Sequence, residues 1–443
     1  MRLARRDILI WVLLSGGTGT LLGTLLETTS YAPMLDFKAV YYGARCLIHH
    51  HDPYNPTEFQ ATYQAAGEEL PADPAKSRVV KPAIFACVNV PTSLFLVTPL
   101  ALLPWGAAHL LWMALTAGGL MLVAFVILEY SGQYAPGSAL FLVGIVLADM
   151  GSLILLGNLA GVAISLCVFA VWCFLSDRWI AAAIMCLALA LMLKPHDTGF
   201  VWFYFVLAGN THRKHALQVL LVIVVLALPA ALWLSHIAPL WPQEQYATLT
   251  AGSIRGGLND PGPTSLSFHS ADGLTNLQSA FSVFRDDPCL YDPASYFVCG
   301  LLFLIGAIRV ARTHFSQGTA WFALAAIASL SMLPVYHRAY DAKLLLLTIP
   351  ACALLWAEGG AIRWVAFFLT SGATGATGAT SVIPSTFLLG ICHDWAEPGG
   401  ESLRHVLPIA QAQLAPLSLL AVGIFYLYVY WSRTAVHDEV PTY

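Results

Sequence analysis

Long apolar runs recur along the whole chain, and short polar segments between them hold most of the charged residues. A run of about 20 apolar residues is long enough to cross a bilayer as a helix. This pattern predicts spans at 8–27, 83–103, 105–129, within 138–176, 179–193, 198–210, 216–236, 295–313, 319–336, 342–357, 362–383 and 413–432. We therefore predict an all-α polytopic membrane protein with about 12 transmembrane helices, forming a single domain over 1–443.

Basic residues set the expected orientation. The arginines at 2, 5 and 6 precede the first span, and the positive-inside rule places them in the cytoplasm. The other short basic loops are at 178, 212–214, 309–312, 363 and 433. They share that side only if the block 138–176 crosses an odd number of times, so we expect one crossing there, joined to a broken or re-entrant helix. Both termini are then cytoplasmic.

Three segments outside the membrane are long: 28–82, 237–294 and 384–412. On this topology all three lie on the outer side, so we expect any chemistry there. The chain is 58% hydrophobic and only 10% charged, with a mean hydropathy of +0.70, whereas soluble domains carry about 25% charged residues. No GxxxxGK[ST] phosphate-binding motif is present. We expect membrane lipids as partners, no nucleic acid and no cofactor.

The first outer segment places a lone carboxylate, Asp36, where the chain leaves the membrane. Apolar residues follow at the spacing of one helix face: Phe37, Val40, Tyr41 and Ala44. This spacing predicts an amphipathic helix lying on the membrane surface. Asp36 has two readings that do not exclude each other, because Asp is also a favoured helix N-cap.

A second polar group sits at the outer end of a span, in residues 333–343. Its ionisable and hydroxyl side chains are Tyr336, His337, Arg338, Asp341 and Lys343. Anchoring at the membrane surface explains the two cations, but it does not explain why five polar side chains lie within so short a segment. Ionisable groups at such depth are functional candidates. Lys194, at another outer span end, is a phosphate-binding candidate or an interfacial anchor. Asp149, inside a span, must be paired, protonated or in a wet cavity.

The sequence predicts no metal site. The three consecutive histidines at 49–51 point about 100° apart on a helix and do not easily converge on one ion, and no Cys/His zinc spacing is present. Cys46, Cys289 and Cys392 fall on the outer side, where any pair of them can be oxidised. The small-residue repeat at 371–381 indicates close helix packing.

Several of these motifs together resemble glycosyltransferase family 87. The matching elements, in chain order, are Asp-Phe…Tyr-Tyr…Asp-Pro-Tyr-Asn-Pro after the first span, the Thr-Pro-Leu…Leu-Pro-Trp segment within 91–112, Gly157-Asn158, Leu193-Lys194-Pro195 and Tyr336-His337…Tyr340-Asp341. The resemblance covers about residues 30–345. Two departures stand out: Tyr-His-Arg replaces the tryptophan-acid-His turn of many relatives, and the loop at 251–270 has no counterpart.

The resemblance implies a C-type glycosyltransferase fold and an inverting transfer from a polyprenyl-phosphate-sugar donor, with a mannose-like hexose favoured. The acceptor is then an envelope lipid or glycan on the outer face of the cytoplasmic membrane. Asp36 falls on the family's first-loop acid and becomes the expected general base. The expected substrate-binding residues are Tyr41, Lys194, His337, Arg338 and Asp341.

Elementary chemistry agrees with this reading. The leaving phosphate needs cations, for which Lys194, Arg338, Lys343, Arg255 and Lys81 are available, and the acceptor hydroxyl needs a base. Two alternatives stay open: a lipid or sugar transporter or flippase, and a non-catalytic envelope-assembly protein. Transporters often show internal repeats, and this chain shows none.

Overall fold

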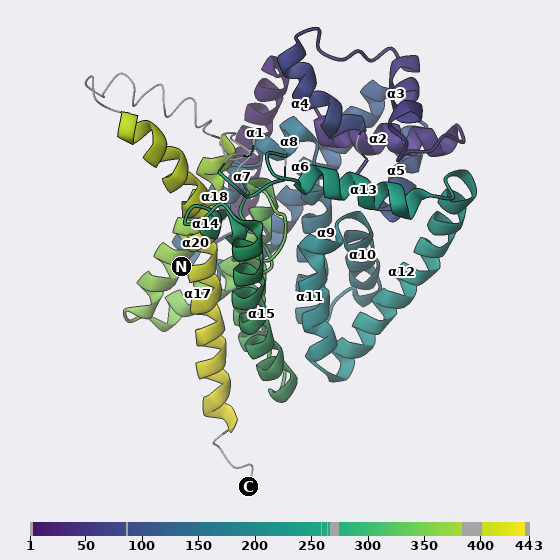
Figure 1. Cartoon of the computed structure of the whole chain (residues 1–443). Coiled ribbons are helices and arrows are strands. Elements are labelled where there is room, and N and C mark those ends of the chain that lie inside the picture. The colour runs from purple at the N-terminus through teal and green to yellow at the C-terminus, as the bar shows by residue number, and fades with distance from the viewer. Residues whose placement is uncertain are drawn as a thin grey trace.

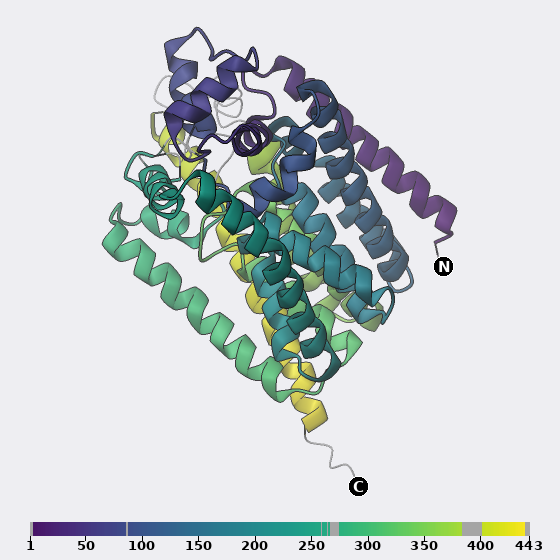
Figure 2. The ribbon, with the colours of Figure 1, turned by 90° about the vertical axis from the view of Figure 1, so that its right-hand side faces the viewer.

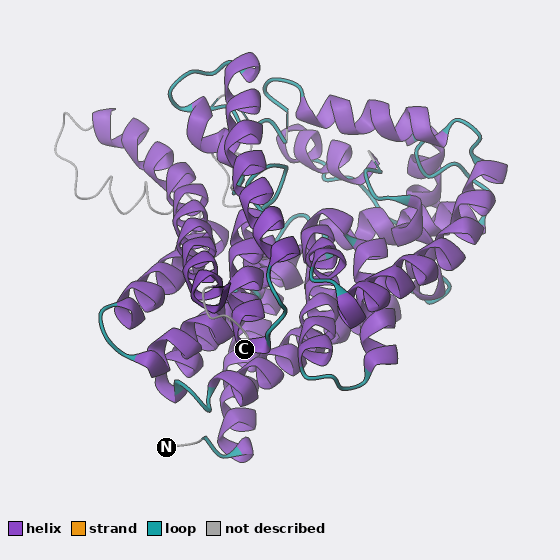
Figure 3. Cartoon of the chain, turned by 90° about the horizontal axis from the view of Figure 1, so that it is seen from below, coloured by secondary structure: helices purple, strands orange, loops and turns teal. Residues whose placement is uncertain are grey.

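The computed structural model of the chain describes residues 3–85, 87–257, 259–263, 265, 274–382 and 401–438. The structure is 79% helical, and the described residues form no strand (Figure 3). Seven helical segments in these residues are long and apolar enough to cross a membrane: Arg5–Thr29, Trp105–Ser131, Pro136–Leu156, Asn210–Ile237, Pro288–Arg312, Ala339–Glu358 and Gln413–Thr434. The predicted all-α, multi-pass architecture is confirmed, while the number of about 12 crossings stays a prediction.

Short helices gather at one end of the helix bundle, which we call the loop end (Figures 1 and 2). They are α2 (Leu35–Ile48), α3 (Pro56–Ala65), α4 (Pro74–Phe85), α5 (Pro91–Ala101) and α13 (Trp241–Ser253). In Figure 1, α13 lies across this end, above the helices of the bundle. The opposite end, where α15 and the C-terminal helix finish, is called the basic end.

The first half of the bundle contains α1 (Arg5–Thr29), α6 (Trp105–Ser131), α7 (Pro136–Ala148), α8 (Gly151–Leu156), α9 (Ala160–Leu175), α10 (Ile180–Leu193), α11 (Pro195–Leu207) and α12 (Asn210–Ile237). The second half contains α14 (Leu277–Ser282), α15 (Pro288–Arg312), α16 (Gln317–Leu330), the 3₁₀ helix η2 (Ala339–Leu347), α17 (Thr348–Glu358), α18 (Ile362–Val382) and α20 (Glu401–Asp438). The long helices run side by side in Figure 2.

The predicted span at 83–103 is wrong. Its residues form the end of α4 and then α5, which has only 11 residues and is therefore about 16 Å long, half of a hydrocarbon core. Thr92, at the start of α5, donates to the carbonyl of Met192, and Tyr41 donates to the carbonyl of Leu103 just beyond its end. Both ends of α5 thus lie at the loop end. Pro91 explains the break, because the residue before a proline avoids helical backbone.

The block 138–176 also differs from its prediction of a single crossing. Gly157, with φ +64°, ends α8, and its carbonyl accepts from Trp112 Nε1 at 2.8 Å. Helices α7 and α8 run parallel to α1, because Gly19 and Gly23 lie beside Leu147 and Ile154. Helix α9 runs parallel to α6, away from the loop end, since Gly161 and Ser165 lie beside Thr116 and Gly119. The block therefore folds into two antiparallel arms that meet at the loop end.

Helix α2 follows the first span, as the apolar spacing predicts, but it is buried on nearly all sides rather than on one face. Tyr42 packs against Tyr63 of α3 and Trp105 at the start of α6, so the face predicted to be polar is covered by these two helices. Met34, with φ 55°, is the N-cap residue, and it makes no side-chain capping bond. Asp36 lies within the first helical turn and is not the cap.

Two further predictions concern the bundle interior. The small-residue repeat forms the second half of α18, where Ala373, Thr374 and Thr377 are buried against neighbouring helices. Asp149 forms a buried ion pair with Lys343, so the expectation that this carboxylate is paired is confirmed. A buried charge needs such a partner. This contact ties the turn between α7 and α8 to η2.

Candidate functional site

Three separate parts of the chain meet at the loop end beside the first turn of α2. They are the break after α8, the junction between α10 and α11, and the turn that leads into η2. Each of these places is a helix end or break, where the backbone leaves regular geometry and polar side chains are brought to one point. The side chains that meet there are Asp36, Asn158, Lys194, His196, Asp197, His337 and Asp341, and Arg338 joins them through its backbone N–H.

Asn158 connects Asp36 to Lys194. Its Nδ2 donates to Asp36 Oδ2 at 2.6 Å, and its Oδ1 accepts from Lys194 Nζ at 3.3 Å. The same Oδ1 accepts from the backbone N–H of Ala160 at 2.8 Å, which fixes the amide at the start of α9. Asp36 is half-buried, whereas Asn158 and Lys194 are buried.

Lys194 is the central cation of the cluster. Its ammonium group contacts Asp341 Oδ1 directly and lies 3.3 Å from Asp197 Oδ2. Asn158 and Asp341 accept hydrogen bonds from the ammonium group, and Asp197 forms an ion pair with it. Burial lowers the pKa of Lys194, but the two carboxylates outweigh this effect and hold the pKa above its ordinary value. The side chain is therefore charged although it is only 7% exposed.

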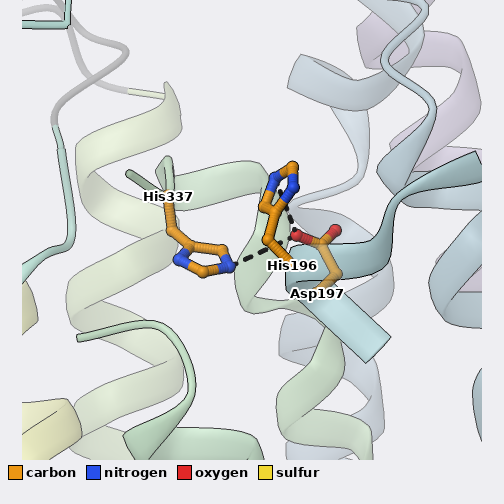
Figure 4. A group of neighbouring side chains, drawn as sticks. All are labelled: His196, Asp197 and His337. Carbon is orange, nitrogen blue, oxygen red and sulfur yellow. Dashed lines mark ion pairs between the residues drawn. The ribbon is translucent and has the colours of Figure 1, made fainter. Parts of the chain in front are cut away.

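Two histidines flank Asp197. His337 Nε2 lies 3.3 Å, and His196 Nε2 3.4 Å, from the same carboxylate oxygen, Oδ1 (Figure 4). Burial lowers the pKa of His337, but the Asp197 carboxylate more than reverses this and leaves the pKa above its ordinary value. Burial together with the charge of Lys194 puts the pKa of His196 far below its ordinary value.

Arg338 and Asp341 hold the turn before η2 in shape. The backbone N–H of Arg338 donates to Asp341 Oδ2 at 2.9 Å. The guanidinium Nε donates to the hydroxyl of Tyr336 at 2.5 Å. Since the other oxygen of Asp341 contacts Lys194, this turn is fixed directly to the junction between α10 and α11.

Five of the six residues singled out from the sequence meet in this cluster: Asp36, Lys194, His337, Arg338 and Asp341. Tyr41 does not share these contacts. It lies about 140° around α2 from Asp36, and its hydroxyl donates to the carbonyl of Leu103 at 2.7 Å. Its ring packs edge-on against Trp105, in the apolar core under the short helices.

Three members of the cluster received no role from the sequence. Asn158 belongs to the Gly157-Asn158 motif, to which the sequence assigned no chemistry, and His196 and Asp197 follow Lys194 directly. A polar residue directly beside a break in an apolar segment was the available signal. The other proposed phosphate-binding cations lie elsewhere: Lys343 pairs with Asp149, Arg255 pairs with Asp286 at 2.5 Å, and Lys81 is exposed on α4.

Cys46 is buried and Cys289 is exposed, and both are free thiols. Cys392 and residues 383–400 of the third outer segment lie outside the described residues, as do several positions of the loop 251–270. The predicted oxidised pair that would include Cys392 therefore stays a prediction.

The arrangement combines a half-buried carboxylate with nearby buried cations at the edge of a membrane bundle. A model of glycosyltransferase family 87 matches residues 88–271 of the chain. This range contains Asn158, Lys194, His196 and Asp197, and the resemblance found in the sequence is confirmed. No curated protein matches the chain.

Proposed function

From the match to glycosyltransferase family 87, which indicates a membrane glycosyltransferase, we propose the following reaction for this chain. The protein transfers a sugar, with a mannose-like hexose favoured, from a polyprenyl-phosphate-sugar donor to an envelope lipid or glycan. Transfer takes place on the outer face of the cytoplasmic membrane. Asp36 is the general base, and the anomeric carbon is inverted.

The observation that carries the proposal is the continuous contact from Asp36 through Asn158 to Lys194. A transferase of this class needs a base for the acceptor and, a few ångströms away, positive charge for the leaving phosphate. Asp36 is not used as a helix cap. Its half-buried carboxylate, oriented by Asn158, is therefore available to a hydroxyl group.

The bond changes follow from this placement. Asp36 takes the proton from the acceptor hydroxyl while the hydroxyl oxygen attacks the anomeric carbon. The bond between that carbon and the phosphate oxygen breaks, and its electron pair leaves with the polyprenyl phosphate. Attack opposite the leaving group inverts the configuration. No nucleotide is needed, because the donor carries its own leaving group.

Charge beside the leaving phosphate comes from Lys194 and Arg338. The ammonium group of Lys194 already contacts Asn158, Asp341 and Asp197. It therefore acts on a phosphate through its charge, or by exchanging one of these contacts. Arg338 is fixed by its backbone bond to Asp341, and a guanidinium is well suited to phosphate oxygens.

An apolar groove supports a lipid-linked donor. It lies between α11, α15, α16 and α20. Helix α11 begins at the cluster with His196 and Asp197, and it lines the groove one to two turns later with Phe200 and Phe203. A polyprenyl chain lying in this groove would have its phosphate end near the cluster.

The proposed topology keeps 12 crossings but assigns them differently from the sequence pattern. Helix α5 stays at the loop end, and the block 138–176 contributes two arms. Arg5 pairs with Glu129 at the end of α6, so that end of α6 lies beside the N-terminus, which the positive-inside rule assigns to the cytoplasm. Cysteine labelling tests this: a reagent confined to the outside should reach position 69 and miss position 133. The reverse pattern would overturn the outward-facing site.

Sugar transfer in proteoliposomes tests the donor. Purified protein should transfer sugar from a polyprenyl-phosphate-hexose to an envelope lipid extract, and the product should show the inverted anomer by NMR. The same sugar presented as a nucleotide sugar should give no product. Transfer from the nucleotide sugar in the absence of any lipid-linked donor would refute the proposal.

A further inference from the structure

The side chains of His196, Asp197 and His337 form a compact cluster of two imidazole rings around one carboxylate. Asp197 Oδ1 lies 3.4 Å from His196 Nε2 and 3.3 Å from His337 Nε2. All three candidate ligand atoms lie within 4.8 Å of one another. In Figure 4 the two rings, one from the start of α11 and one from the turn before η2, approach the carboxylate from different sides.

Hydrogen bonding does not explain this approach. Within the part of the chain that the structure describes, His196 Nε2, His337 Nε2 and Asp197 Oδ1 are buried and have no hydrogen-bond partner. His337 Nδ1 lies 3.1 Å from the carbonyl oxygen of Val335, which can only accept, so Nδ1 carries a proton. In the neutral ring the lone pair of Nε2 then faces a carboxylate oxygen. Two acceptors in contact need a cation or a proton between them.

The distances match those around a bound metal ion. Zinc binds histidine nitrogen and carboxylate oxygen at about 2.0–2.2 Å in tetrahedral geometry. This geometry places neighbouring ligand atoms about 3.3–3.5 Å apart. The two contacts of Asp197 Oδ1 have this separation. The two nitrogens lie within 4.8 Å of each other.

The surroundings are those expected for a metal site. A ligating histidine usually donates its other nitrogen to a carbonyl or carboxylate, as His337 does to Val335. Lys194 contacts Oδ2 of Asp197 and leaves Oδ1 for the ion. Asp197 and His337 are 2% and 0% exposed. The side chain of His196 is 37% exposed and gives an ion and a water ligand access from one side.

The local charge also favours a cation. The carboxylates of Asp36, Asp197 and Asp341 are linked to the ammonium group of Lys194 directly or through Asn158. Arg338, whose backbone N–H donates to Asp341, adds a second cation to the same turn. Three negative and two positive charges leave one negative charge when both imidazoles are neutral. A divalent ion with neutral imidazole ligands reverses this sign.

We propose that His196, Asp197 and His337 form a binding site for one divalent transition-metal ion of the zinc class, with a water or an anionic oxygen as the fourth ligand. Two imidazoles and one carboxylate select this class over Mg²⁺ and Ca²⁺, which prefer oxygen ligands. The rival explanation is a proton: a charged His337 ring paired with Asp197, with His196 only adjacent. A measurement of metal binding distinguishes the metal ion from the proton directly and does not depend on an assay of sugar transfer.

The test uses full-length protein without an affinity tag, stripped with a chelator and dialysed. Calorimetric titration with Zn²⁺ should show one ion per chain, and Mg²⁺ should not compete. His196→Gln and Asp197→Asn should each weaken binding by at least about 10-fold, the loss that even an outer-shell change causes. Absence of a stoichiometric site in the wild-type protein would overturn the proposal.

The matched control is the exposed histidine run at 49–51. Replacing all three of these histidines with Gln should leave the stoichiometric site intact. Loss of binding in that variant, with retention in His196→Gln, would move the site to the surface and overturn the assignment. X-ray absorption of the Zn²⁺-loaded wild-type protein provides a measurement independent of any variant. It should show two imidazole nitrogens in the first shell, and a shell without imidazole would also contradict the site.

Discussion

Lys194 neutralises two buried carboxylates, and removal of its ammonium group should destabilise the fold. In Lys194→Met the side chain keeps its approximate length, but Asp197 and Asp341, which are 2% and 1% exposed, lose their shared cation. The 3.3 Å contact with Asp197 corresponds to a gross attraction of about 5 kcal/mol at an effective dielectric constant of about 20. Breaking a buried pair typically costs about 3–5 kcal/mol. We expect the free energy of unfolding of Lys194→Met to be lower than that of the wild type by about 3–5 kcal/mol.

A second substitution tests the cause of that loss. The double variant Lys194→Met/Asp341→Asn removes one of the stranded charges, so it should be more stable than Lys194→Met by about 1–3 kcal/mol, the usual range of coupling between contacting residues. Unfolding of the purified proteins in detergent, followed by tryptophan fluorescence, measures both differences without any substrate. Lys214→Met, at an exposed position, is the matched control and should resemble the wild type. Wild-type stability in Lys194→Met, or a double variant no more stable than the single one, would refute the electrostatic account.

Three further predictions concern residues around the cluster. Asn158→Ala should lower kcat by about 10–100-fold with little change in donor KM, because the base loses its orienting amide; unchanged kcat would remove Asn158 from the mechanism. Gly157→Ala should destabilise the fold and lower activity, because the added Cβ would lie 2.6 Å from Phe37 Cβ and because the φ of +64° suits glycine. The control is Gly137→Ala, whose added Cβ meets no atom within 4 Å and which should change neither stability nor activity. Glu244 should make stability depend on pH, because burial, and then the hydrogen bond and charge of Asp52, raise its pKa to about 7. The folded state binds the proton of Glu244 more tightly than the unfolded state does. The protonated side chain therefore stabilises the fold fully near pH 4.5, and this stabilisation is lost as the pH rises through about 7. Thermal unfolding at about pH 6 and pH 8 should show the loss in the wild type, and Glu244→Gln should not show it.

Several parts of the fold were predictable because the bilayer imposes simple rules. Apolar length predicts helices, and the ends of apolar runs locate polar side chains near the membrane edge. For this reason Asp36, Lys194 and His337, which are far apart in sequence, were all expected at the loop end. Their meeting there follows from helix packing, which no local pattern contains.

The two wrong spans show where the rules fail. The segment 83–103 is apolar enough to span, but Pro91 divides it and its second part is an 11-residue helix. The block 138–176 was assigned one crossing, although Gly157 turns the chain back into the bundle. One helix too many and one too few leave the number of long apolar elements unchanged, so the orientation inferred from the basic loops stays a prediction.

Asn158, His196 and Asp197 were overlooked for a different reason. Each is an ordinary residue at a helix start or break, where caps and turn residues are common. Their significance depends on partners far along the chain, as in the contacts of Asp36 with Asn158 and of Asp197 with His337. A single sequence does not encode such distances in any visible pattern.

The central claim is that Asp36 is the base of a sugar transfer, and Asp36→Asn tests it most directly. The substitution keeps an oxygen that can accept from Asn158, and helix α2 does not use Asp36 as its cap. The variant should therefore fold, bind the lipid-linked donor and lose transfer by about 10²–10⁴-fold, the range that a general base contributes. Glu69→Gln, an exposed acid in the same outer segment, should transfer sugar at the wild-type rate. A folded Asp36→Asn protein with near-normal turnover of the polyprenyl-phosphate-sugar donor would contradict the account.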